Sequence, residues 1–308
     1  MSHSVVVGID GSEQSTAAAA WAAAEADRSG RALRMIHVGG AEDGRPLRPA
    51  GADDGLPPEL LAVRDRLTAD LPGLDLSCER IPGSPAHALA AAGARGGLIV
   101  LGSRGLGGFT GLLVGSVGLR VAADALCPVV LVRAGTGTGA GADREADGEA
   151  DAAADAAGDV AGDVVGDVVV GVQGDRACAE VLAFAFEQAA RRGVTLRVLE
   201  SRSLPAGPYV TQAPVDQREI RDSLAEAELV RLRDALARWR DKFPRVRVEA
   251  EVTARHAGGA LVDASRGASL VVLGRRTPAH QAGVSRLGSV AHAVLHHALC
   301  PVAIVPRD

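Results

Sequence analysis

Lysine, aromatic residues and long apolar runs are scarce in this 308-residue sequence, and each scarcity excludes a class of protein. Lys242 is the one lysine among 33 basic residues, so a phosphate-binding loop that requires a lysine is excluded near the glycine-rich segments. Aromatic residues make up 2% of the chain and the net charge is -5, which excludes the basic and aromatic stripe of a nucleic-acid binder. No apolar run reaches the roughly 18–20 residues of a membrane span. We therefore expect neither nucleic acid nor a membrane as a partner.

Metal, disulfide and catalytic motifs are absent as well. Cys78, Cys127, Cys178 and Cys300 are far apart without CxxC spacing, and no histidine pair has metal-ligand spacing with a third donor. There is no GxSxG elbow and no Ser/His/Asp or Cys/His set, so we expect no catalytic residue. The N-terminus MSHSVVVGID lacks the basic and apolar regions of a signal peptide. These features predict a cytoplasmic protein with reduced thiols that serve packing.

Three segments of the first half recur in the same order in the second half, which indicates an internal duplication. They are VVVGIDGS (5–12) and VVVGVQGD (168–175), LIVLGSRG (98–105) and LVVLGRRT (270–277), and VGSVGLRVAADALCPVVLVR (114–133) and LGSVAHAVLHHALCPVAIVPR (287–307). Residues 134–166 are rich in Gly, Ala and Asp, which predicts a flexible acidic linker. We therefore expect a first domain at 1–133 and a second at 167–308.

Each half alternates short runs of β-branched residues with alanine-rich stretches. In the first half we expect strands at 4–9, 31–38, 74–80, 98–101 and 128–132, and helices at 12–28, 57–70, 85–94 and 116–125. Ser12 should cap the first helix. The second half repeats the pattern with a longer helix at 218–239. Continuous apolar strands in βαβ order predict two tandem α/β domains, each a doubly wound, five-stranded parallel sheet covered on both faces.

The segment GSRGLGGFTGLLVGS (102–116) follows the fourth strand of the first half. Glycines between a strand and a helix are typical of phosphate sites, because backbone N–H groups and the helix N-terminus favour anions. A P-loop requires a lysine, and a dinucleotide fingerprint requires GxGxxG after the first strand, so neither matches. A kinase glycine loop fails because HRD and DFG are absent. The spacing that remains is Gly102-x2-Gly105-x9-Gly115-Ser116.

This spacing resembles that of the universal stress protein family, whose ATP-binding members carry G-x2-G-x9-G-[ST] after the fourth strand. VVVGIDGS, the IHV that ends the second strand, GSPAHAL before the third helix and CPVVLVR are similar to that family as well. The resemblance covers nearly all of the chain outside the linker. It implies an adenine nucleotide alpha hydrolase-like, Rossmann-like fold whose two apolar fifth strands pair antiparallel as an internal pseudo-dimer. A further homodimer is left open.

The resemblance and the physical reading agree on a phosphate site in the first half. Gly102 and Gly105 would let the backbone approach the α- and β-phosphates. The N–H groups of Gly115, Ser116 and Val117 would hold the outer phosphates at the start of a helix, with the Ser116 hydroxyl assisting. Ser116 could instead serve only as a helix cap.

The resemblance also implies where the nucleoside lies. Asp10 would contact the ribose at the carboxyl edge of the sheet, although an Asx-turn or a helix cap would also suit this residue. Arg104 would either cover the phosphates or stay a solvated surface charge. The backbone of Ile9 and Val38 would meet the adenine edge. Gly8 and Leu101, at the ends of their strands, complete the expected site.

The second half departs from this pattern. Gln173, Thr277 and Arg255 stand where the first half has Asp10, Gly105 and Gly83. The spacer before Gly288 is one residue longer, and Gly288-Ser289 itself is retained. We therefore expect a degenerate nucleotide site there, with some remaining affinity for anions.

The resemblance implies an ATP-binding protein with a nucleotide-responsive regulatory or protective role in stress. ATP would bring Mg²⁺ with it, since no sequence feature dedicates a metal site. We expect binding without designed turnover, with at most slow ATP hydrolysis or autophosphorylation. One alternative is a dimerisation module that binds no nucleotide. The other is an adenylyl-transferring enzyme of the same fold, although its SGGxDS-like or HxGH loop is absent.

Overall fold

The computed structural model describes residues 4–39, 56–105, 114–134, 166–173, 179–202, 217–276 and 287–307. The first half consists of β1 (Val5–Gly8), α1 (Glu13–Ser29), β2 (Leu33–Gly39), α2 (Pro58–Asp70), β3 (Leu76–Pro82), α3 (Pro85–Gly96), β4 (Leu98–Gly102), α4 (Ser116–Asp124) and β5 (Val129–Val132). The second half consists of β6 (Asp167–Val172), α5 (Ala179–Arg192), β7 (Leu196–Ser201), α6 (Gln217–Lys242), β8 (Val248–Thr253), α7 (Ala257–Ala264), β9 (Ala268–Arg276), α8 (Ser289–His297) and β10 (Val302–Arg307). The expected linker lies almost wholly outside the described residues.

Local signals account for the helix boundaries. Ser12 caps α1, since its Oγ accepts a hydrogen bond from Ser15 N at 3.1 Å. Gly30 ends α1 in the left-handed region at φ 61°, where a residue with a Cβ is strained. The long helix α6 turns one face to the core, where Leu236 and Trp239 are buried.

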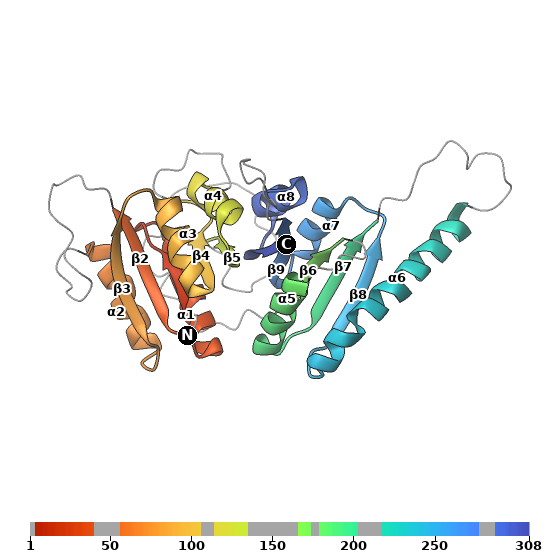
Figure 1. The fold of residues 1–308 in the computed structure, drawn as a ribbon, viewed down its shortest axis with the longest axis horizontal. Helices are drawn as coiled ribbons and strands as arrows, with labels where there is room; N and C mark the ends of the chain where they lie inside the picture. Colours follow the sequence, from red (N-terminus) through yellow and green to blue (C-terminus); the bar gives the residue numbers. More distant parts are fainter. Residues whose placement is uncertain are drawn as a thin grey trace, which may run out of the picture.

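The ten strands form one sheet in the order β3-β2-β1-β4-β5-β10-β9-β6-β7-β8. Within each half all neighbouring strands are parallel, which confirms the doubly wound α/β fold. The two halves meet where β5 pairs antiparallel with β10, with Ala303 opposite Val130. Figure 1 shows the red-to-yellow first half and the green-to-blue second half on either side of this junction. The outermost strands of the sheet are therefore β3 and β8 rather than the two fifth strands.

Both faces of the sheet are buried, because successive residues of a strand point to opposite faces. On β1, Val5 and Val7 join a core with α1, α2, α5 and α6, whereas Val6 joins a second core with α3, α4, α7 and α8. Each of these two cores contains residues of both halves. Among the helices that the structure describes, none is long and apolar enough to cross a membrane.

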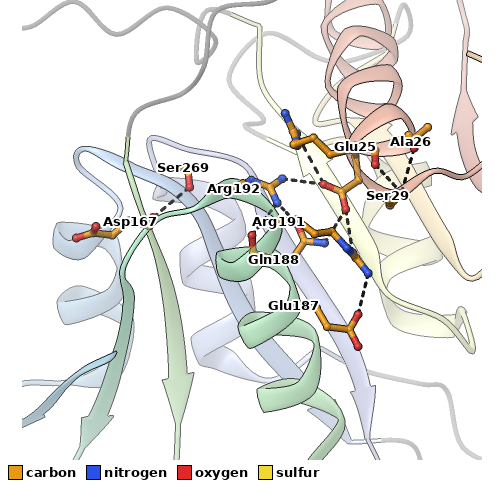
Figure 2. Close-up of polar contacts among 10 residues, drawn as sticks. Glu25, Ala26, Ser29, Asp167, Glu187, Gln188, Arg191, Arg192 and Ser269 are labelled. Carbon is orange, nitrogen blue, oxygen red and sulfur yellow. Dashed lines mark hydrogen bonds and ion pairs between the residues drawn. The ribbon is translucent and has the colours of Figure 1, made fainter. Parts of the chain in front are cut away.

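A buried ion cluster joins α1 of the first half to α5 of the second (Figure 2). The Glu25 carboxylate, 1% exposed, accepts a hydrogen bond from Gln188 Nε2 at 2.8 Å and pairs with Arg191 at 3.3 Å and Arg192 at 3.1 Å. The Arg192 guanidinium also lies over the Trp21 ring, 5.4 Å from its centroid. Burial lowers the pKa of Arg192 to about 10, and Glu25 partly offsets this effect.

Two arginines cross the junction in opposite directions and contact helix C-termini. Arg133, which follows β5, donates from Nη2 to the carbonyls of Leu295 and His296 near the end of α8. Arg275 of β9 donates from Nη2 to the carbonyl of Ala125, the residue that ends α4. A helix C-terminus has unpaired carbonyls and partial negative charge, so a guanidinium is a favourable partner there. The end of one helix in each half is thus held by the other half.

Candidate functional site

A cavity of about 290 Å³ opens at the carboxyl ends of β1, β2 and β4, next to the start of α4. Doubly wound sheets bind ligands at this edge. The eleven residues that the sequence assigns to a nucleotide site all line the cavity: Gly8, Ile9, Asp10, Val38, Leu101, Gly102, Arg104, Gly105, Gly115, Ser116 and Val117. The fold therefore brings together residues that lie up to 109 positions apart along the chain.

Asp10 follows β1 and is fixed by its own turn. Its Oδ1 accepts hydrogen bonds from Ser12 N at 3.0 Å and from Ser12 Oγ at 2.6 Å, which is an Asx-turn. Its Oδ2 lies against Gly105, where a Cβ would overlap with it. The turn and the cavity thus use the same carboxylate, so the turn holds Asp10 in a defined orientation at the cavity wall.

The three glycines of the predicted spacing have different surroundings. A Cβ on Gly102 would lie 2.7 Å from the Gln14 carbonyl carbon, so this glycine allows β4 to pass close to α1. Gly105 makes room for the Asp10 carboxylate. A Cβ on Gly115 would meet nothing closer than 3.6 Å, and φ of -75° there is open to any residue. Close neighbouring atoms therefore explain why residues 102 and 105 are glycines, but not why residue 115 is a glycine.

Helix α4 presents its N-terminus to the cavity. Gly115 is its cap residue and has no side chain to cap the first turn. Ser116 is therefore the first helical residue and not the cap, which corrects the alternative reading of this serine. The Gly115 N–H donates to the Ser103 carbonyl at 2.7 Å, which corrects the expectation that it holds a phosphate and leaves that role to Ser116 and Val117. The first amide groups of a helix lack partners within it and carry partial positive charge, which favours an anion. Ser116 is exposed, and the Val117 side chain is about one-third exposed.

Sequence reasoning missed residues that shape the other end of the cavity. The His37 Nδ1 lies 3.0 Å from the Ile9 carbonyl, and because a carbonyl only accepts, the ring nitrogen donates. Ile9 N in turn donates to the Ile36 carbonyl at 2.9 Å, which fixes the backbone expected at an adenine edge. Pro85 and Leu89 of α3 also line the cavity. Their signal was available, because both belong to the GSPAHAL motif.

Arg104 lies at the cavity wall and is exposed, so both expectations for it remain open. Burial lowers the pKa of Arg133, and the positive charge of Arg104 lowers it further. An anion beside Arg104 would reduce that repulsion. Among the described lining residues, Arg104 and Asp10 are the charged ones.

The cavity combines polar groups with apolar walls. The Asp10 carboxylate suits a donor such as a hydroxyl, while the α4 N-terminus and Arg104 suit a polyanion. Leu89, Leu101 and Ile36 supply apolar surface between strand ends and α3. Within the described part of the chain, no group of three or more His, Cys, Asp or Glu side chains is arranged to hold a metal ion.

Comparison with known proteins gives a consistent result for both halves. The model of the universal stress protein family matches residues 1–133 and 165–306. The Mycobacterium tuberculosis universal stress protein Rv2005c is 30% identical over 99% of this chain and 98% of its own length. Universal stress protein Rv2623 of the same organism is 28% identical over 99% and 96%. A crystal structure of a universal stress protein from Archaeoglobus fulgidus has a TM-score of 0.59 over the full length of both chains, at 15% identity.

Proposed function

This chain belongs to the universal stress protein family over both halves, and we propose that its first half binds ATP in the cavity beside α4. The observation that carries the proposal is the cavity itself, which combines the Asp10 carboxylate with the N-terminus of α4. We further propose that the second half holds no ATP, because Gln173 replaces Asp10 there. The domain division at 1–133 and 167–308 and the pseudo-dimer through β5 and β10 belong to the same proposal.

The ribose end of the proposed site rests on Asp10. A carboxylate accepts hydrogen bonds from both hydroxyls of a ribose diol, and such charge-assisted bonds are roughly twice as strong as neutral ones. The Asx-turn with Ser12 orients the carboxylate before any ligand arrives, so less ordering entropy is lost on binding. The adenine edge would meet the backbone of Ile9 and Val38, and the bond from His37 supports that backbone.

The phosphate end rests on backbone groups and one side chain. The N–H groups of Ser116 and Val117 at the start of α4 would bind the outer phosphates, and Gly102 and Gly105 the inner ones. Arg104 would add a mobile positive charge. Mg²⁺ would arrive bound to the phosphates of ATP. None of these residues is arranged to activate water, so we propose binding with at most slow hydrolysis.

A nucleotide-responsive role is supported by the position of α4. This helix is nine residues long, its N-terminus faces the cavity, and its C-terminal Ala125 carbonyl accepts from Arg275 of the other half. A polyanion at one end of α4 is therefore about one short helix away from the contact between the halves. We propose that a regulatory partner reads the nucleotide state through this junction.

The test is calorimetric titration of the full chain with ATP and with 2′,3′-dideoxy-ATP, which lacks the ribose diol. Asp10→Ala should weaken ATP binding about tenfold to a hundredfold, because a hydrogen bond to a charged group contributes about 1.5–3 kcal/mol. Dideoxy-ATP should bind the unaltered chain more weakly by a similar factor, and Asp10→Ala should abolish this discrimination. Gln173→Ala, at the matching position of the second half, is the control and should change nothing.

Three results would overturn the proposal. ATP affinity that is unchanged by Asp10→Ala would remove the ribose contact. Absence of any binding would favour the dimerisation module. Multiple turnover with a second substrate would favour the adenylyl-transferring enzyme. Thermal unfolding of Asp10→Ala checks that its turn still forms.

A further inference from the structure

A second cavity, of about 800 Å³, lies in the second half at the place that corresponds to the first. Its walls include Gly171, Leu261 and Leu273, the counterparts of Gly8, Leu89 and Leu101. The start of α8 lies in it as the start of α4 lies in the other cavity. The replacements in this half therefore change the lining of the cavity without filling it, and the volume is within the range of ligand sites.

The two cavities differ most in charge. In the first, the charged lining residues are Asp10 and Arg104, whose charges cancel. In the second, the described lining residues include Arg255, Arg275 and Arg307 and no carboxylate, while Asp263 outside the lining pairs with Arg255. His256 adds a fourth basic group. Two of the arginines are specific to this half, since Arg255 and Arg275 stand where the first half has Gly83 and Ser103.

Each arginine is anchored by contacts that leave it at the wall. Ser201 Oγ donates to the Arg255 carbonyl at 2.6 Å, while the Arg255 side chain is 64% exposed and pairs with Asp263. The Arg307 stem packs against Gly274, where a Cβ would lie 3.2 Å from its Cδ. Arg275 is 4% exposed, and burial lowers its pKa. Its Nη2 donates to the Ala125 carbonyl of the first half, so Arg275 serves the junction between the halves.

The start of helix α8 adds positive electrostatic potential to the same cavity. Gly288 is its cap residue and has no side chain to cap the first turn, and the amide groups of Ser289 and Val290 place partial positive charge at the cavity. Guanidinium groups bind phosphate oxygens in a bidentate manner, and Arg255 and Arg307 line the same cavity as this helix N-terminus. Gln173, by contrast, replaces the carboxylate that a ribose diol would need.

We propose that the second cavity binds a compact ligand that carries several phosphate groups, recognised through Arg255, Arg307 and the α8 N-terminus without a ribose contact. The ligand class comprises inorganic oligophosphates and phosphorylated metabolites with two or more phosphates. This site is separate from the proposed ATP site and does not depend on it. It gives the two halves of one duplicated fold different ligands.

The test is calorimetric titration of the full chain, saturated with ATP, with inorganic tripolyphosphate, and in a parallel arm with fructose 1,6-bisphosphate. We expect one additional site per chain for at least one of these probes. Comparison of the two affinities decides between an inorganic oligophosphate and a phosphorylated metabolite. Arg255→Ala and Arg307→Ala should each weaken the binding about tenfold to a hundredfold, as the loss of a charge-assisted bond to phosphate requires.

Arg247→Ala is the matched control, because it removes the same charge from an arginine side chain that is 78% exposed and lies outside the cavity lining. It should leave the affinity unchanged. Failure of both probes to bind would overturn the proposal, and so would binding that Arg255→Ala and Arg307→Ala do not weaken. Displacement of the bound probe by further ATP would also overturn it, because the cavity would then be a second nucleotide site. If the chain binds no ATP at all, the Arg255-dependent binding of the probe should persist.

Discussion

Replacing Gly105 by alanine should impair ATP binding through Asp10, although the two residues are 95 positions apart. A Cβ on Gly105 would overlap with Oδ2 of Asp10, so one of the two must move. The carboxylate is held on its other side by Ser12 N at 3.0 Å and Ser12 Oγ at 2.6 Å. Displacing it therefore breaks either this turn or the alignment toward a ribose diol.

The magnitude follows from the bonds at stake. Losing one charge-assisted hydrogen bond costs about 1.5–3 kcal/mol, and each 1.4 kcal/mol is a factor of ten, so Kd for ATP should rise about tenfold to a hundredfold. Calorimetry at constant salt measures this. Gly73→Ala is the matched control, since a Cβ there would have no neighbour within 4 Å, and it should leave Kd unchanged.

A double-mutant cycle tests whether Gly105 affects ATP binding through Asp10. In an Asp10→Ala background the obstructing oxygen is gone, so adding Gly105→Ala should weaken ATP binding no further. Independent, additive losses would mean that Gly105 acts on the ligand directly and not through Asp10. Unchanged ATP affinity in the single variant Gly105→Ala would refute the steric argument altogether.

Two further predictions concern the structure around the site. Glu25→Ala should lower the free energy of unfolding by about 3–5 kcal/mol in urea titrations, because it leaves the buried guanidinium of Arg192 without its carboxylate. Glu249→Ala, which removes an exposed ion pair with Arg247, is the control and should cost under about 1 kcal/mol. A loss below 1 kcal/mol for Glu25→Ala would contradict the buried cluster. Burial raises the pKa of Cys127 to about 11 and of Cys300 to about 12, so both thiols stay protonated at pH 8 and iodoacetamide should label them only as the chain unfolds. Labelling of the native protein at the rate of a free thiol, followed by mass spectrometry, would contradict that burial.

Much of the cavity could be predicted from the sequence because parallel strands bring their carboxyl ends to one edge. Asp10 follows the first strand and Gly102 ends the fourth, so the order of strands is enough to bring them together. The spacing of Gly105 and Gly115 then predicts a close turn before a helix. The separate steric roles of Gly102 and Gly105 depend on which atoms lie beside them, and the spacing carries no information about that.

The contacts between the halves could not be predicted, because they join side chains far apart in the sequence. Glu25 lies in an alanine-rich helix, where a charged residue usually marks the solvent face. It is buried because α5 of the other half supplies Gln188 and Arg192. The same holds for Arg275 and Ala125, since no local pattern predicts that a strand residue holds the end of a distant helix.

The second cavity shows the opposite limit of sequence reasoning. Gln173 and Thr277 replace Asp10 and Gly105 at the matching positions, which predicts a degenerate nucleotide site. That prediction concerns which ligand binds and not whether a cavity is present. The structure retains a cavity of about 800 Å³ there, and its lining includes Gln173, Arg255 and Arg275. A departure from the family's sequence pattern therefore does not show that the cavity itself is lost.

The central claim is that this tandem chain holds one ATP, in its first half. Native mass spectrometry of the full chain with excess ATP counts the bound nucleotides directly. The account predicts one ATP per chain, lost in Asp10→Ala and retained in Gln173→Ala. Two equivalent ATP molecules per chain, or one that survives Asp10→Ala and disappears in Gln173→Ala, would contradict it.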